Sequence, residues 1–134
     1  MLLRITVGGI YLTQAYLALF VATPRGTASF IEKMGFPAPT LLALLVIAIH
    51  GIGGAMLVAG MLTRAAAVLN AAVLLVGMLA VYLRQGHVPR GALIDTATGR
   101  APGYEYVALL VAATIAITTL GGGGSGASGS ARAK

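Results

Sequence analysis

The chain has 134 residues, of which 58% are hydrophobic and 9% are charged, and its net charge is +6. A soluble domain carries roughly 25% charged residues, so this composition excludes an ordinary water-facing surface and favours a protein whose surface faces lipid. The basic residues are scattered, mostly at the ends of apolar runs, which is typical of membrane anchoring and does not indicate nucleic-acid binding. Because the chain has no cysteine, disulfides, iron–sulfur clusters and thiol catalysis are excluded.

Four apolar stretches follow one another, at about residues 2–22, 40–62, 65–83 and 103–120. Each is close to the roughly 20 residues that a helix needs to cross the hydrocarbon layer. The predicted fold class is therefore all-α, an integral membrane four-helix bundle. A cleavable signal peptide is the alternative for the first stretch, but its long apolar run favours a retained span.

The connection between the first two spans reads "TPRGTASFIEKMGFPAPT". Ser29 and Glu32 have the spacing of a capping box, and Gly35 is a plausible helix end. Pro37 and Pro39 prevent the helix from continuing. We expect a short amphipathic helix at the membrane surface.

The remaining connections differ in kind. "GMLTR" is short, with Gly60 as a helix stop and Thr63 as an N-cap, and it predicts a tight antiparallel hairpin. The polar segment 85–102 contains three arginines at or beside it and is a candidate docking surface. Residues 121–134 have the composition of a flexible Gly/Ser-rich linker. We therefore expect a membrane domain at 1–120 and a tail at 121–134.

Four spans place both termini on the same side of the membrane. Lysines and arginines are divided almost equally between the two sides, so the positive-inside rule does not decide the orientation. The flexible basic tail and the short hairpin favour cytoplasmic termini, in a bacterial inner (cytoplasmic) membrane.

His50 lies near the middle of the second span, within "LLVIAIHGIGGAMLVAG". Helical spacing places it on one face with Gly53 and Gly54, where small residues allow a neighbouring helix to approach. We expect it to face the bundle interior and to be neutral, since no acid lies at its depth. Gln14 is expected at a similar depth, whereas Asn70 is expected some 9 Å nearer the side of the termini, so Gln14 is the predicted hydrogen-bond partner.

Several roles for these polar residues stay open. His50 and Gln14 either join helices or face a cavity that binds a quinone, lipid or pigment, and His50 could also be a single axial haem ligand. Glu105, in the first turn of the fourth span, either complements the helix dipole or handles protons and contacts a ligand. The predicted cofactor-binding residues are His50, Gln14 and Glu105, with neither a catalytic residue nor a metal site predicted.

The chain resembles the DoxX family of small four-span membrane proteins. The resemblance rests on Arg4, Gly8 and Gly9, and on the ordered segments "FIEKMGFPAP", "GGAMLVAGMLTRAAAVLNAAVL" and "GYEYVALLVAA". It implies a four-helix bundle. Some members are membrane subunits linked to thiosulfate or quinone oxidoreduction, and others accompany oxidoreductases. The family usually has a glutamate just before the paired glycines of the second span, where this chain has His50.

The favoured function is an accessory integral-membrane subunit of a larger redox or quinone-linked assembly, with the bilayer and other membrane subunits as partners and without catalytic activity of its own. An autonomous quinone-linked oxidoreductase subunit of the thiosulfate:quinone type, with His50 and Glu105 handling protons, is the main alternative. A small carrier for an apolar solute is the third hypothesis.

Overall fold

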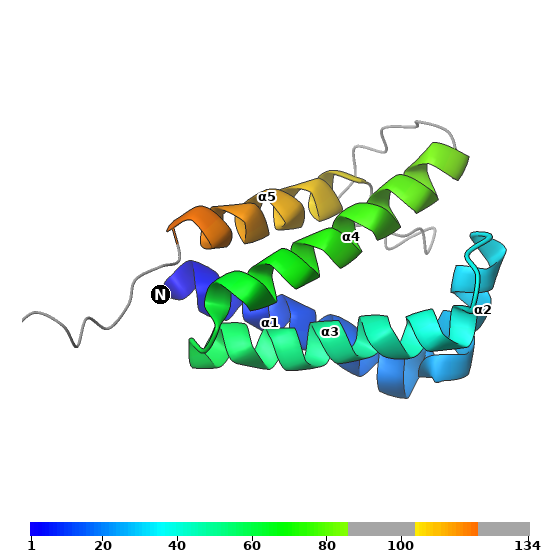
Figure 1. Cartoon of the computed structure of the whole chain (residues 1–134), viewed down its shortest axis with the longest axis horizontal. Helices are drawn as coiled ribbons and strands as arrows, with labels where there is room; N and C mark the ends of the chain where they lie inside the picture. Colours follow the sequence, from blue (N-terminus) through cyan, green and yellow to red (C-terminus); the bar gives the residue numbers. More distant parts are fainter. Residues whose placement is uncertain (86–103, 121–134) are drawn as a thin grey trace, which may run out of the picture.

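A computed structural model describes residues 1–85 and 104–120 of the chain, and all regular structure in these ranges is helical. The segment 86–103, which holds nearly all of the predicted docking surface, and the tail 121–134 lie outside the described residues. In chain order (Figure 1) the elements are α1 Leu2–Tyr16, η1 Leu17–Val21, α2 Thr23–Lys33, α3 Pro39–Ala59, α4 Thr63–Gln85 and α5 Tyr104–Leu120.

Three helical stretches among the described residues are long and apolar enough to cross a bilayer: Leu2–Val21, Pro39–Ala59 and Thr63–Ala80. Only 22%, 28% and 17% of the residues in their most apolar windows are buried, so most of each apolar helix is left for lipid to cover. The chain is thus a multi-pass membrane protein. The apolar part of α5, Tyr106–Thr119, is shorter, and its crossing stays a prediction.

The long helices pack side by side. α3 packs against α1 and α4, while α5 packs against α4 and, over a smaller area, against α1. Figure 1 shows the start of α1, the α3–α4 hairpin and the end of α5 at one end of the molecule. The apolar core between the helices includes Val7, Leu57, Ala67, Leu110 and Ile117.

The short helix between the first two long helices exists, but it begins earlier than predicted. α2 starts at Thr23, so Ser29 lies inside the helix and the expected capping box is wrong. The predicted end at Gly35 is confirmed, because Gly35 has a φ of 76° and its N–H donates to the carbonyl of Glu32. The Phe36 N–H donates to the carbonyl of Ile31, which completes the C-terminal turn.

The tight hairpin between α3 and α4 is confirmed. Gly60 ends α3 with a φ of 80°, and the Met61 N–H donates to the carbonyl of Met56. The guanidinium of Arg4 lies against Gly60, where a Cβ atom would be 2.8 Å from Nη2. The absence of a side chain at Gly60 therefore allows both the turn and the approach of a cation to the negative end of α3.

Candidate functional site

Four polar side chains meet inside the protein, one from each of the four long helices. They are Tyr11 on α1, His50 on α3, Asn70 on α4 and Thr114 on α5; His50 is 6% exposed and the other three are fully buried. We refer to these four residues as the polar core. Burying polar groups away from water costs free energy unless they find partners, so their hydrogen bonds decide what they do.

His50 and Asn70 form the first pair. The imidazole Nδ1 lies 3.0 Å from the Asn70 Oδ1, and the Asn70 Nδ2 donates to the carbonyl of Ala66 at 2.8 Å. Because the amide nitrogen is used by Ala66, the oxygen must be the acceptor for His50. The imidazole therefore carries its proton on Nδ1 and has Nε2 as the proton-accepting nitrogen.

Tyr11 and Thr114 form the second pair, with 2.7 Å between their hydroxyl oxygens. The Thr114 hydroxyl donates to the carbonyl of Leu110, one turn earlier in α5, at 2.6 Å. Since threonine has a single hydroxyl proton, Tyr11 is the donor in the bond between the two side chains. This bond connects residues 103 positions apart and holds α5 against α1.

Ring contact between Tyr11 and His50 joins the two pairs. Their ring centroids are 5.1 Å apart and the rings are tilted by 46°, a spacing within the range of favourable aromatic contacts. The polar core thus runs from α4 through α3 and α1 to α5.

Glycines make the space that the polar core needs. A Cβ atom at Gly53 would collide with the Asn70 side-chain amide, so only glycine leaves room for that side chain on α3. At Gly54 a Cβ atom would lie 2.9 Å from the Gly8 carbonyl oxygen. The backbones of α1 and α3 therefore approach closely, as small residues permit in membrane helices.

A family model described as DoxX matches residues 1–83, well over half of the chain. The chain belongs to the DoxX family. No curated protein and no solved structure matches it in the corresponding comparisons. The DoxX match includes three of the polar-core residues, Tyr11, His50 and Asn70, but ends before α5 and Thr114.

The position of His50 in this DoxX protein is as predicted, buried on the face of α3 that also buries Gly53, Gly54 and Leu57. The predicted bond to Gln14 is wrong, because the imidazole bonds to Asn70. Counted from the centre of the hairpin at residue 61, His50 and Asn70 are eleven and nine positions away, a difference of only about 3 Å. The expected depth of Asn70 was therefore in error.

Gln14 is half-buried at the edge of the α1 face that buries Val7, Tyr11 and Ala15. Glu105 lies in the first turn of α5, and its side chain is outside the described part of the structure. The cofactor-binding roles of these residues and of His50 stay predictions. Among the described residues, His, Asp and Glu side chains form no group of three able to hold a metal ion.

Sequence reasoning missed Tyr11 and Thr114. A signal for Tyr11 was present, since Gly8 and Ala15 lie one turn before and after it and mark a close helix contact. There was less reason in the sequence to single out Thr114, because Thr118 and Thr119 carry the same hydroxyl group in the same helix. Like Thr114, those two threonines donate to carbonyls of α5, but both are more exposed than Thr114.

Proposed function

We propose that this DoxX protein is an accessory subunit of a larger membrane assembly of redox or quinone-linked type. In this proposal α1, α3, α4 and α5 cross a bacterial inner membrane as a four-helix bundle, with both termini in the cytoplasm. α2 lies at the membrane surface, and the tail 121–134 is available to partners. At 17 residues α5 is about 26 Å long, slightly less than the roughly 30 Å hydrocarbon layer.

The observation that carries the proposal is the internal pairing of the polar core. Four buried polar side chains hydrogen-bond to one another or to backbone carbonyls of their own helices. Such bonds between membrane helices each contribute roughly 0.6–2 kcal/mol and favour one arrangement of the helices. A core whose polar groups are paired with one another favours a structural role, in which the bundle offers its outer helix faces to other subunits, over catalysis.

Mild purification tests the accessory role. The full chain, tagged and extracted from native membranes in a gentle detergent, is expected to bring other membrane subunits in a fixed ratio. His50→Gln, which can still donate to Asn70, is expected to bring the same subunits in the same ratio. A chain that purifies alone and by itself reduces decylubiquinone or oxidises decylubiquinol would contradict the accessory role.

Quinone-linked oxidoreduction by this chain is the second candidate. It is favoured by the proton arrangement of His50, because Nδ1 is used by Asn70 and Nε2 is the nitrogen able to accept a proton. In this candidate His50 and Glu105 handle protons, and Gln14 contacts the quinone. His50→Gln would then keep the helices assembled but abolish turnover of decylubiquinone, and unchanged turnover would exclude it.

A further inference from the structure

Arg4 is a cation on the buried side of α1. It lies four and seven positions before the buried residues Gly8 and Tyr11, so helical spacing turns its side chain toward the other helices. The guanidinium rests against Gly60, at the C-terminal end of α3. Arg4 is half-buried for this reason. The other basic side chains whose exposure the structure describes are exposed: Arg25, Lys33 and Arg64.

The guanidinium of Arg4 has no hydrogen-bond or ion-pair partner among the described residues. Its Nε is enclosed by the protein and meets no acceptor. Nη1 and Nη2 also meet no acceptor, but they are not enclosed, so the forked end of the guanidinium is open to the surroundings. Because a partly buried charge without a partner is costly, an acceptor from outside the chain would offset that cost.

The end of the molecule that holds Arg4 has positive charges and no acid in its described part. Figure 1 shows the start of α1, the α3–α4 hairpin and the end of α5 there, which brings together the amino terminus, Arg4 and Arg64. Glu32 is in the last turn of α2 and Glu105 in the first turn of α5, both away from this end. The third acid, Asp95, lies outside the described residues. The acceptor for Arg4 is therefore expected to be an external anion.

The depth of Arg4 indicates where that anion comes from. Arg4 is the third residue of the apolar span Leu2–Val21, and Gly60 directly follows the span Pro39–Ala59. The guanidinium thus lies where the spans end, and the headgroup layer of a bilayer begins at that level. Arginine side chains at this level keep their charged group at the headgroups.

Exposed apolar side chains surround the same end of the molecule. Each of them is between 64% and 90% exposed, which is unfavourable in water and favourable at the boundary between headgroups and acyl chains. They are Met1, Leu2, Met61 and Leu62. The anion nearest to this end is therefore the phosphate of a lipid.

The missing acid also selects the type of lipid. A choline or ethanolamine headgroup brings an ammonium group, which would find cations and no carboxylate in the described part of this end. Phosphatidylglycerol brings a phosphate without an ammonium group. The charges therefore favour an anionic phospholipid over a zwitterionic one.

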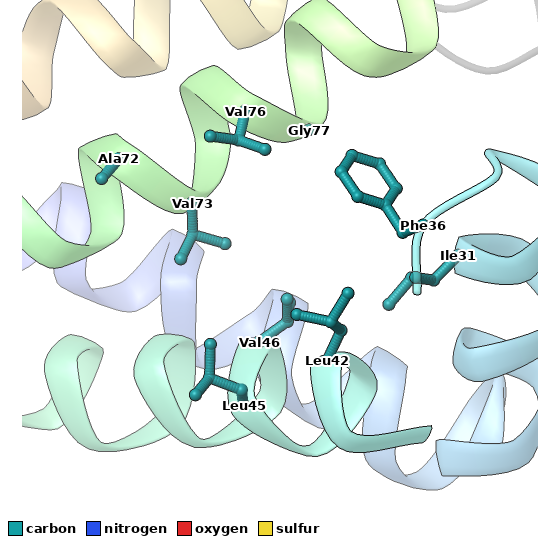
Figure 2. A pocket seen from close by; sticks show the side chains of 9 residues that line it. All are labelled: Ile31, Phe36, Leu42, Leu45, Val46, Ala72, Val73, Val76 and Gly77. Atoms are coloured by element: carbon teal, nitrogen blue, oxygen red, sulfur yellow. The ribbon is translucent and has the colours of Figure 1, made fainter. Parts of the chain in front are cut away.

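The opposite end of the α3–α4 pair lacks these features. Figure 2 shows side chains of both helices facing each other there across an apolar pocket. Every side chain that lines it is hydrocarbon, as Val46 and Val73 illustrate, so the pocket offers a phosphate no donor. In α2 the exposed Lys33 directly follows the exposed Glu32, whose charge opposes its own.

We propose that Arg4 binds the phosphate of an anionic phospholipid at the hairpin end of the protein, through Nη1 and Nη2. The forked end of a guanidinium matches two phosphate oxygens with parallel hydrogen bonds. The bound phosphate neutralises the cation that lies between α1 and the end of α3. This binding is independent of the accessory role, so either can fail while the other holds.

Native mass spectrometry of the purified full chain tests the proposal, with dioleoyl phosphatidylglycerol and dioleoyl phosphatidylcholine offered in equal amounts. The wild type is expected to prefer phosphatidylglycerol. Arg4→Gln is expected to reduce that preference about tenfold or more, because it removes hydrogen bonds between charged groups. Arg64→Gln is the matched control, since it removes an exposed charge from the same end and is expected to reduce the preference by no more than about fivefold. Equal reductions, or a wild type without preference, would overturn the proposal.

Thermal unfolding separates lipid binding from a purely structural role of Arg4 at the end of α3. Bicelles that contain phosphatidylglycerol are expected to raise the Tm of the wild type and of Arg64→Gln above that in phosphatidylcholine, but not the Tm of Arg4→Gln. Each protein is compared with itself, so a change in basal stability does not affect the result. The same rise in Arg4→Gln would contradict the proposal. An equal rise of the wild type on adding inorganic phosphate to phosphatidylcholine bicelles would contradict the lipid assignment.

A measurement on the wild type covers the case in which Arg4→Gln does not fold. Phosphatidylglycerol with a photoreactive group in its headgroup is expected to label the peptides of residues 1–7 and 59–65 above those of residues 23–36. The latter range contains the exposed cations Arg25 and Lys33. Equal labelling of that range would show ordinary contact with headgroups and overturn the proposal.

Discussion

His50 shows how a titratable side chain is accommodated inside an apolar helix. Its position near the middle of α3 would expose a polar ring to hydrocarbon if it faced outward, so burial against other helices is favoured. There the imidazole donates to Asn70 and contacts the ring of Tyr11. The imidazole is thus accommodated by two neighbours, neither of which carries a charge.

Substitutions at His50 should separate polarity from charge. His50→Gln keeps a donor for Asn70 and should cost about 2 kcal/mol or less. His50→Leu leaves the buried Asn70 Oδ1 without that donor and should cost about 1–3 kcal/mol, with the fold retained. His50→Asp and His50→Lys should be much less stable, since a charge at mid-bilayer costs at least about 2.5–3.5 kcal/mol. Unfolding of the purified variants in lipid–detergent bicelles measures this order. An aspartate variant as stable as the glutamine variant would contradict the buried environment.

Gly53 and Gly51 give a second residue-scale test. Gly53→Ala places a methyl group against the Asn70 amide, which is already held by Ala66, and should destabilise by about 1–3 kcal/mol. Gly51→Ala meets only the Ala15 methyl at 3.6 Å and should be neutral or slightly stabilising. Thermal unfolding of both variants provides the measurement, and equal effects would be inconsistent with a packed Asn70.

Glycines allow a close backbone approach between α1 and α3. Gly8 and Gly54 face each other, and a Cβ atom at either would lie within 3 Å of the other's carbonyl oxygen. A backbone oxygen cannot move aside as a flexible side chain can. The position of Tyr11, one turn beyond Gly8, and hence of the whole polar core, depends on this approach.

Alanine substitutions along α1 test the approach. Gly8→Ala should push α1 from α3 and cost about 1–3 kcal/mol. The neighbouring Gly9→Ala should be tolerated or stabilising by up to about 1 kcal/mol, because its Cβ meets no atom within 4 Å. Unfolding in bicelles compares the two. A Gly9 variant that loses as much stability as the Gly8 variant would contradict the packing explanation, because alanine raises helix propensity at both positions.

Across the whole molecule, hydrophobicity predicted the long helices well, because the bilayer requires long apolar runs. The side on which His50 is buried followed from its neighbouring glycines. The hydrogen-bond partner of His50 could not be predicted in the same way. The estimated depth of Asn70 in the membrane was wrong by a few residues along α4, and this error excluded Asn70. The role of Thr114 depends on which face of α5 packs against α1. The hydrophobic pattern of α5 does not indicate that face.

The membrane orientation is a further whole-molecule prediction. Four crossings with cytoplasmic termini require a reporter fused after Lys134 to be active only in its cytoplasmic form. A fusion near residue 36, beyond α2, should be active only on the opposite side. Signals on opposite sides for fusions at the two termini would show an odd number of crossings and exclude α5 as a span.

The bond between Tyr11 and Thr114 tests most directly whether α5 shares one polar core with α1, α3 and α4. A double-mutant cycle with Tyr11→Phe and Thr114→Val, measured by unfolding in bicelles, should give a coupling of about 0.6–1.7 kcal/mol. The control pair Tyr16→Phe and Thr118→Val should give additive losses, because Tyr16 is 58% exposed and Thr118 bonds within α5. Additive losses for Tyr11 and Thr114 as well would contradict the shared core.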